Sequence, residues 1–253
     1  MSQAPDYILQ ARGLTKRFGG FCAVSNLDLD VRRHSIHALI GPNGAGKSTC
    51  FNLLTRFLDP TAGTITFNAQ DITRTPPAKL ARMGVARSFQ ISAVFPRLTV
   101  LQNVRVALQH TLGTQYHFWR SEKSLSVLDD KARALLAEVG LAKREEAVAG
   151  TLPYGAKRAL EIATTLALEP ELLLLDEPMA GLGHEDIDVV TEVLRGVARG
   201  RTILMVEHNM NVISTLSDTI TVLARGEVLA EGDYAELSQD PRVIEAYLGS
   251  GHV

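Results

Sequence analysis

A nine-residue segment near the start of the chain has the residue types and spacing of a phosphate-binding loop, GxxxxGK followed by Ser or Thr. Glycines let backbone N–H groups approach phosphate oxygens, and a helix beginning at the loop adds the positive end of its dipole. Lys47 would place its charge on the β- and γ-phosphates, and the Ser48 hydroxyl would be a ligand of Mg²⁺. The segment comprises Gly41, Pro42, Asn43, Gly44, Ala45, Gly46, Lys47, Ser48 and Thr49.

An acidic pair after an apolar run supplies the second half of the expected chemistry. Leu172–Leu175 is followed directly by Asp176 and Glu177. We expect Asp176 to reach the metal through water, and Glu177 to act as the general base that polarises the water attacking the γ-phosphate. By itself this motif is weak, because a solvated strand end has the same pattern. Together with the phosphate loop it predicts hydrolysis of a nucleoside triphosphate.

Two further residues are candidates with weaker signals. His208 follows the apolar run 202–206. A lone histidine at a strand end is usually structural, but parallel strands present their carboxyl ends together, which makes His208 a candidate sensor of the γ-phosphate. Gln90 by itself is consistent with an exposed amide, and its spacing alone assigns it no role.

Strand-like and helix-like segments alternate along the chain, which favours an α/β fold with a largely parallel sheet. Ile36–Ile40 is an apolar run that ends at Gly41, as a buried strand before a phosphate loop would, and this disfavours a glycine-rich turn without a ligand. Further strands are expected at 7–12, 27–31, 64–67, 172–175 and 202–206, a hairpin at 219–224 and 228–230, and helices at 48–57, 157–168, 187–197 and 241–248.

The middle of the chain has a different pattern. From about residue 99 to 140 it is mainly helical, with apolar residues at 128, 132, 135, 136 and 139 on one helical face. Gly140 then provides a C-terminal stop. Because this stretch separates two β-containing regions, it predicts an inserted helical subdomain.

Composition excludes several classes of protein. The 253 residues carry a formal net charge of −2, so no global basic field favours nucleic acid. Cys22 and Cys50 are too few for a disulfide framework and form no metal-type CxxC motif. The segment Met1–Asp6 lacks the features of a signal peptide, and no apolar run approaches the ~18 residues of a membrane span. A membrane role would require docking onto another protein.

The order of these motifs resembles that of the nucleotide-binding subunit of ATP-binding cassette (ABC) transporters over nearly the whole chain. The similarity is greatest to the branched-chain amino-acid importer type, on Phe89-Gln90, Glu207-His-Asn-Met210 and Tyr247-Leu-Gly249. It implies a P-loop NTPase core with a mainly parallel sheet, an N-terminal antiparallel β subdomain and an inserted helical signature subdomain. The chain would be a single domain, 1–253, with the insert at about residues 91–165.

This resemblance implies roles that the residues alone do not. Phe18 would stack on the adenine of ATP, and Gln90 would touch the metal or the attacking water and relay to the membrane subunit. The signature loop 152–156, with Gly155, would close over the γ-phosphate of ATP bound to a second cassette. Implied partners are transmembrane permease subunits, a second ABC ATPase subunit in a homo- or heterodimer and, indirectly, an extracytoplasmic substrate-binding protein. The implied location is the cytoplasmic face of the inner membrane, and no nucleic acid is expected.

Two positions depart from the family pattern. The usual signature Leu-Ser-Gly-Gly-Gln is here Leu152-Pro-Tyr-Gly-Ala156, so Pro153 removes a serine hydroxyl that would bond the γ-phosphate. Gly155 and the N-terminus of the following helix remain as donors. Tyr154 resembles the branched-chain importer type. Gly183 stands where the family usually has Asp, which removes an expected carboxylate contact across the dimer.

The implied function is ATP-driven import of branched-chain amino acids or related small organic solutes, and other functions are alternatives to it. ATPases of lipid or lipopolysaccharide exporters have a similar C-terminal ending. A soluble ABC ATPase of repair or translation would usually have paired cassettes or a long coiled coil, and a P-loop kinase or GTPase would lack the signature loop and the histidine. A cassette that only binds ATP is disfavoured by Lys47, Asp176 and Glu177.

Overall fold

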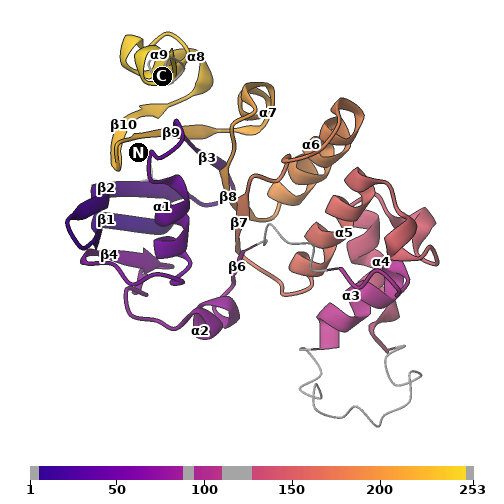
Figure 1. Ribbon diagram of the computed structural model, residues 1–253. Coiled ribbons are helices and arrows are strands. Elements are labelled where there is room, and N and C mark those ends of the chain that lie inside the picture. Colours follow the sequence, from indigo (N-terminus) through magenta and orange to yellow (C-terminus); the bar gives the residue numbers. More distant parts are fainter. Residues whose placement is uncertain (1–5, 88–93, 110–126, 249–253) are drawn as a thin grey trace, which may run out of the picture. The chain divides into compact units, whose positions relative to one another are not determined.

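The computed structural model describes residues 6–87, 94–109 and 127–248. They form two compact units, which are described separately (Figure 1). The first unit contains the described residues up to Arg87 together with 171–178 and those from Gly200 onward. The second contains the described residues within 88–170 and also 179–199. The insert expected at about residues 91–165 stays a prediction of domain boundaries.

An antiparallel sheet opens the first unit, with the strand order β2-β1-β4-β5. Strands β1 (Tyr7–Phe18) and β2 (Phe21–Arg32) form one long hairpin, whose turn contains Gly19 with a φ of 57°. Strand β4 (Ala62–Phe67) pairs with β1 on its other edge, and the short β5 (Gln70–Asp71) pairs with β4. The N-terminal antiparallel β subdomain that the family resemblance implied is therefore present.

The second sheet of this unit is the predicted, mainly parallel one. Its order is β10-β9-β3-β8-β7-β6, and only β10 runs antiparallel to its neighbour. All five residues of β3, of β7 and of β8 are buried, as expected for parallel strands that are covered on both faces. The strands are β3 (Ile36–Ile40), β6 (Val85–Arg87), β7 (Leu172–Asp176), β8 (Thr202–Val206), β9 (Thr219–Ala224) and β10 (Glu227–Gly232).

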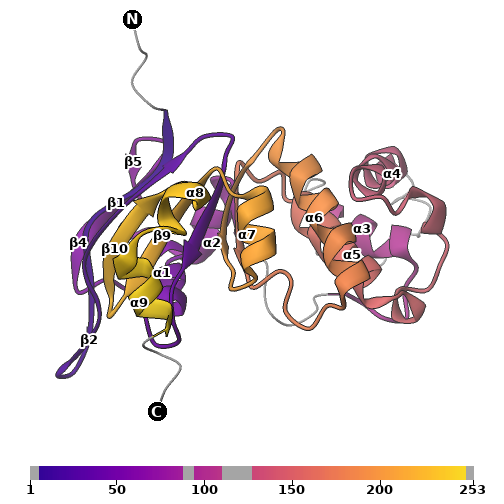
Figure 2. The same cartoon turned by 90° about the horizontal axis from the view of Figure 1, so that it is seen from above.

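One hydrophobic core joins the two sheets of the first unit. Helix α1 (Lys47–Leu54) contributes Phe51 and Leu54, which are packed with residues of both sheets, including Leu9 and Leu174. Helices α8 and α9 pack beside strand β10 (Figure 2). The other helices of this unit are α2 (Pro77–Arg82), α7 (Met210–Leu216), α8 (Tyr234–Leu237) and α9 (Pro241–Leu248).

The second unit is helical among the residues that the structure describes. Its helices pack in pairs, α3 on α4 and α5, and α5 on α6. A capping box begins α3, in which Thr99 and Gln102 satisfy each other's backbone N–H groups. The elements are α3 (Val100–Leu108), α4 (Asp129–Glu138), the 3₁₀ turns η3 (Ala142–Arg144) and η4 (Ala149–Thr151), α5 (Tyr154–Leu166) and α6 (His184–Ala198). Within the described parts of both units, no helix combines the length and apolarity needed to cross a membrane.

Several element boundaries differ from the sequence prediction. The strands expected at 7–12 and 27–31 are longer, because they pair along nearly their whole length in the β1–β2 hairpin. Helix α1 ends at Leu54 rather than 57, because Arg56 adopts a left-handed backbone with a φ of 61°. Helix α5 begins at Tyr154 rather than 157. The hairpin at 219–230 and the helix Pro241–Leu248 are confirmed.

A histidine is buried in the centre of the parallel sheet. The His37 Nε2 atom lies 2.8 Å from the Thr221 hydroxyl on the neighbouring strand, and that hydroxyl donates to Glu231. Burial lowers the pKa of His37 to about 4; Arg32 acts in the same direction and Asp30 opposes it. The side chain is therefore neutral in the folded protein at neutral pH.

This buried histidine should make the protein acid-sensitive. Between its ordinary pKa of 6.5 and about 4, the unfolded chain binds the extra proton, so stability falls as pH falls through this window. The slope from this one group is at most about 1.4 kcal/mol per pH unit. In urea denaturation, the stability advantage of wild type over His37→Gln should shrink as pH is lowered. A difference between wild type and His37→Gln that stays constant with pH would contradict the prediction.

Candidate functional site

The carboxyl ends of three adjacent parallel strands bring the predicted site residues of the first unit together. Strand β8 lies between β3 and β7. Its last residue, Val206, is in register with Leu39 of β3 and with Asp176 of β7. The phosphate loop follows β3, Asp176 ends β7 and His208 follows β8, so all three lie at the carboxyl ends of neighbouring parallel strands.

The phosphate loop has the backbone that its glycines predicted. Gly41, Gly44 and Gly46 have φ values of 149°, 78° and 101°. Gly46 is the left-handed N-cap of α1, so Ser48 and Thr49 lie in the first turn of that helix. A Cβ atom at Gly41 would lie 2.2 Å from the carbonyl oxygen of Leu223 in β9. The loop can therefore take this path beside β9 only with glycine at its first position.

The tip of the β9–β10 hairpin holds the middle of the loop. The backbone N–H of Gly226 donates to the Ala45 carbonyl at 3.0 Å, and the Gly226 carbonyl accepts from the N–H of Ser25 in β2 at 2.8 Å. A Cβ atom at Gly46 would lie 2.6 Å from the carbonyl oxygen of Ala23. Strand β2 and the hairpin thus fix the loop from one side.

Lys47 lies close to both acidic residues of the predicted site. Its ammonium group donates to the carbonyl oxygens of Gly41 at 2.6 Å and Pro42 at 3.0 Å, so it folds back over the loop. Burial lowers the pKa of Lys47, while the charges of Glu177 and Asp176 act in the opposite direction. A cation, two carboxylates and a helix N-terminus therefore surround the loop, and this donor set suits a Mg²⁺-bound triphosphate.

The acidic pair at the end of β7 is placed as the sequence predicted. Asp176 is buried, and the backbone N–H of Glu177 donates to the Val206 carbonyl at 2.9 Å. Glu177 has a φ of 48°, an uncommon conformation for a residue with a side chain. Such strain, worth about 1–3 kcal/mol, is often found at functional positions.

The histidine segment leaves its side chain in solvent. The His208 side chain is 66% exposed. The carboxylate of its neighbour Glu207 is fully buried and accepts from the backbone N–H groups of His208 and Asn209 at 2.8 and 3.0 Å. Glu207 therefore fixes the turn that presents His208. Sequence reasoning did not assign Glu207 a role, although its position directly after a buried strand was visible.

The three remaining predicted residues lie in different places. Phe18 ends β1 with 48% of its surface exposed, which leaves the ring available for stacking, and Lys16 Nζ lies 5.1 Å from its centroid. Gly155 lies in the first turn of α5, where a Cβ atom would be 2.4 Å from a carboxylate oxygen of Asp186 in α6. Gln90 lies outside the described residues.

Two residues near the loop had not been singled out as contacts. Arg87, at the end of β6, forms an ion pair with Asp176, with a distance of 2.8 Å between Nη2 and Oδ2. Burial raises the pKa of the Tyr247 hydroxyl in α9 to about 12, while the nearby Gly41 backbone acts in the opposite direction. Neither residue has a spacing motif that could have revealed it in the sequence.

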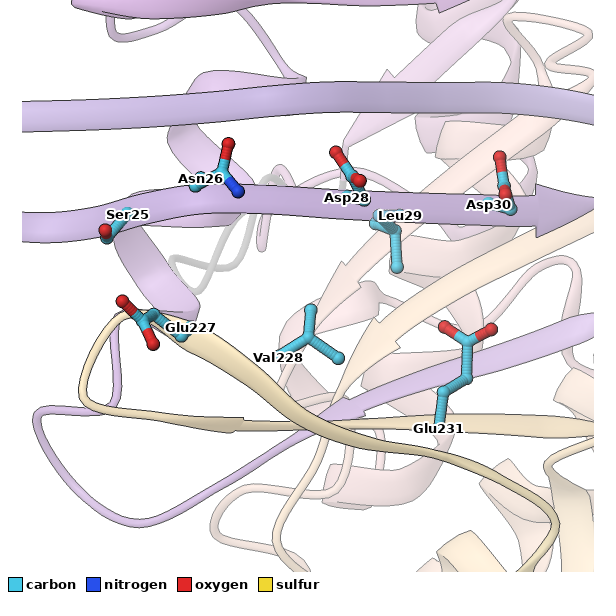
Figure 3. Close-up of a pocket in the computed structure, with 8 residues that line it drawn as sticks. All are labelled: Ser25, Asn26, Asp28, Leu29, Asp30, Glu227, Val228 and Glu231. Carbon is cyan, nitrogen blue, oxygen red and sulfur yellow. The ribbon is translucent and has the colours of Figure 1, made fainter.

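A pocket elsewhere in the first unit contains none of the predicted site residues. Figure 3 shows it between β2 and β10, with several carboxylates on its walls. Asp30 accepts from Arg12, and Glu231 accepts from Thr221, so these two acids have partners within the protein. The candidate site residues therefore lie outside this pocket. The pocket residues are Ser25, Asn26, Asp28, Leu29, Asp30, Glu227, Val228 and Glu231.

Comparison with known families agrees with this site. The family model described as ABC transporter matches residues 24–180, which include the phosphate loop and the acidic pair. The chain belongs to the ABC transporter family. It binds ATP and is an ATPase that drives transport. A second family model, described as branched-chain amino acid ATP-binding cassette transporter, matches residues 227–253.

Individual relatives match over almost the full chain. The high-affinity branched-chain amino acid transport ATP-binding protein LivG of Salmonella typhimurium is 40% identical, over 96% of this chain and 98% of the relative. BraF of Pseudomonas aeruginosa, which has the same description, is 39% identical with the same coverage. These relatives favour the importer prediction over the exporter alternative.

A solved structure supports the fold. The crystal structure of the ADP conformation of an ATP-binding cassette of an ABC transporter has a TM-score of 0.82 and 30% identity. The matched region covers 96% of this chain and 99% of the chain in the crystal structure. The predicted fold class is thereby confirmed.

The packing of Gly41 against β9 gives a test of the loop. Gly41→Ala should lower both stability and ATP affinity, because the new Cβ atom cannot coexist with the Leu223 carbonyl. Gly140→Ala is the control, since its φ is also positive, 75°, but its Cβ atom would meet nothing within 4 Å. The control should lose only about 1–2 kcal/mol. Urea denaturation and fluorescent-ATP titration measure both effects, and equal losses in the two variants would contradict the packing argument.

Proposed function

We propose that this chain hydrolyses Mg-ATP to power an importer of branched-chain amino acids. The observation that carries the substrate class is the match of its C-terminal residues, 227–253, to the branched-chain amino acid cassette family. The full-length similarity to LivG and BraF supports it, because their described transport is of branched-chain amino acids.

Binding of the triphosphate would use the loop and the start of α1. Lys47 would exchange its contacts with the Gly41 and Pro42 carbonyls for phosphate oxygens, and N–H groups of the loop and first turn would donate to the phosphates. Ser48 and Asp176 would hold Mg²⁺, which supplies charge stabilisation for the phosphoryl group being transferred. The exposed ring of Phe18 would stack on adenine.

Hydrolysis would depend on groups at the ends of β7 and β8. Glu177 would accept a proton from the attacking water, because it follows the proposed metal carboxylate and is held by its backbone bond to Val206. His208, presented by the buried Glu207, would contact the γ-phosphate. Gln90 would contact the metal or the attacking water.

Closure of the site would require a second cassette, identical to this one or a paralogue. Gly155 and the first turn of α5 would offer backbone N–H groups to the γ-phosphate of ATP bound to the partner. Pro153 and Gly183 offer neither a hydroxyl nor a carboxylate for that contact. The paired cassettes would dock onto transmembrane permease subunits at the cytoplasmic face of the inner membrane, supplied by an extracytoplasmic substrate-binding protein.

The phosphate-binding role of Lys47 has a direct test. Lys47→Ala should reduce ATP affinity by about tenfold or more, because it removes a charged hydrogen-bond donor from the phosphate site. Lys143→Ala, which removes an exposed lysine of the helical unit, should bind ATP as wild type does. Fluorescent-ATP titration measures both, and unchanged affinity in Lys47→Ala would refute the assignment.

The general-base role of Glu177 predicts that a substitution there impairs ATP hydrolysis but not ATP binding. Glu177→Gln should reduce hydrolysis by about 100-fold or more while it still binds ATP, because the amide cannot take the proton. Glu192→Gln, on the exposed face of α6, is the matched control and should hydrolyse at the wild-type rate. The rate of phosphate release from ATP measures hydrolysis in both variants. A near-normal rate in Glu177→Gln would rule out Glu177 as the base.

The transport role is tested in cells of the source organism. Replacement of the chromosomal gene by the Glu177→Gln version should abolish the part of radiolabelled leucine, isoleucine and valine uptake that depends on this gene. The Glu192→Gln replacement should retain it. Loss of uptake of a different solute, with branched-chain uptake intact, would reject the substrate class while leaving the ATPase role in place.

A further inference from the structure

The partly buried arginine at the end of β6 connects three elements of the phosphate site. The Nη2 atom of Arg87 donates to Asp176 Oδ2 at 2.8 Å. Its Nη1 atom donates to Asn52 Oδ1 at 2.6 Å and lies 3.3 Å from Thr55 Oγ1. Asn52 belongs to α1, and Thr55 is the C-cap of the same helix. One guanidinium therefore links β6, β7 and α1.

This cluster is largely shielded from water. The side chains of Arg87 and Asp176 are 15% and 8% exposed. The guanidinium carbon lies 5.8 Å from the ring centroid of Phe51 and 5.7 Å from that of Phe57. A charged pair in such surroundings is held firmly, because separating the partners would leave each as an uncompensated charge with little access to water. The planar fork of arginine can bond two side chains at once, which a lysine ammonium cannot do in the same geometry.

The position of Asn52 on its helix connects the cluster to Ser48. Asn52 follows Ser48 by four residues, so the two lie on the same face of α1. Arg87 thus bonds Asp176 directly and bonds the helix face that carries Ser48. These are the two residues to which the proposed function assigns the metal.

We propose that Arg87 is a positioning residue for the Mg²⁺ site. It fixes the Asp176 carboxylate through Oδ2 and holds α1 in register with β7, so that Ser48 and Asp176 can serve one ion. It does not contact the nucleotide. This inference rests on the proposed metal roles of Ser48 and Asp176.

Nucleotide binding at controlled Mg²⁺ concentration tests this inference. A fluorescent ATP analogue, mant-ATP, is titrated into Arg87→Met in excess EDTA and then at stepped concentrations of free Mg²⁺. The Mg²⁺ concentration at half-maximal binding enhancement should rise by about tenfold or more, as is typical when a residue that orients a metal ligand is lost. Affinity in EDTA should not change, because the phosphate cradle remains. Arg87→Lys should give a smaller rise.

Two controls separate positioning from general damage. Arg105→Met removes a similarly buried ion pair in the helical unit, in which Arg105 Nε lies 3.2 Å from Asp129 Oδ1. It should lower the melting temperature and leave the Mg²⁺ midpoint unchanged. Asp176→Asn should raise the midpoint, because it weakens the proposed metal contact itself.

The outcomes separate this inference from the function on which it rests. A raised midpoint in Asp176→Asn with wild-type midpoints in both Arg87 variants would overturn the role of Arg87 alone. An unchanged midpoint in Asp176→Asn would overturn the metal assignment, and this inference with it. If Arg87→Met does not fold, Arg87→Lys decides by the same criterion.

Discussion

Steric exclusion at the phosphate loop is the constraint on which the site depends. The loop leaves the buried strand β3 and turns beside β9, where the Leu223 carbonyl leaves no room for a side chain at Gly41. Further on, the carbonyl of Ala23 excludes one at Gly46. Because backbone atoms of two sheets enforce this path, the loop is shaped before any ligand binds. This path places Lys47 within electrostatic reach of Asp176 and Glu177 at the end of β7.

The parts of the site that sequence predicted are those set by local chemistry. The phosphate loop, the acidic pair after β7 and the turn at Arg225-Gly226 each carry their signal within a few adjacent residues. The parallel sheet followed from apolar runs such as Ile36–Ile40, whose burial on both faces leaves no alternation. The predicted C-terminal helix Pro241–Leu248 begins with proline, a residue that is favoured at the first helical position.

The features of the fold and site that could not be predicted from the sequence depend on contacts between distant segments. Arg87 meets Asp176 across 89 positions of the chain, and no spacing rule connects them. Strand β1 continues through Lys16 because β2 and β4 supply its hydrogen bonds, although its polar residues do not alternate as a strand should. Arg56 ends α1 by taking a left-handed backbone, a conformation that its residue type disfavours. In each case tertiary pairing overrides local preference.

The bond between Gly226 and Ala45 has a consequence for synthesis of the chain. The loop residues leave the ribosome early, but their hydrogen-bond partner at the β9–β10 turn is about 180 positions later, and β8 and β9 on either side of β3 are also late. A nascent chain that ends before β8 contains every residue of the phosphate loop but lacks β8, β9 and the turn that holds the loop. Nucleotide affinity should therefore emerge only near the completion of translation, once these late strands have paired with β3.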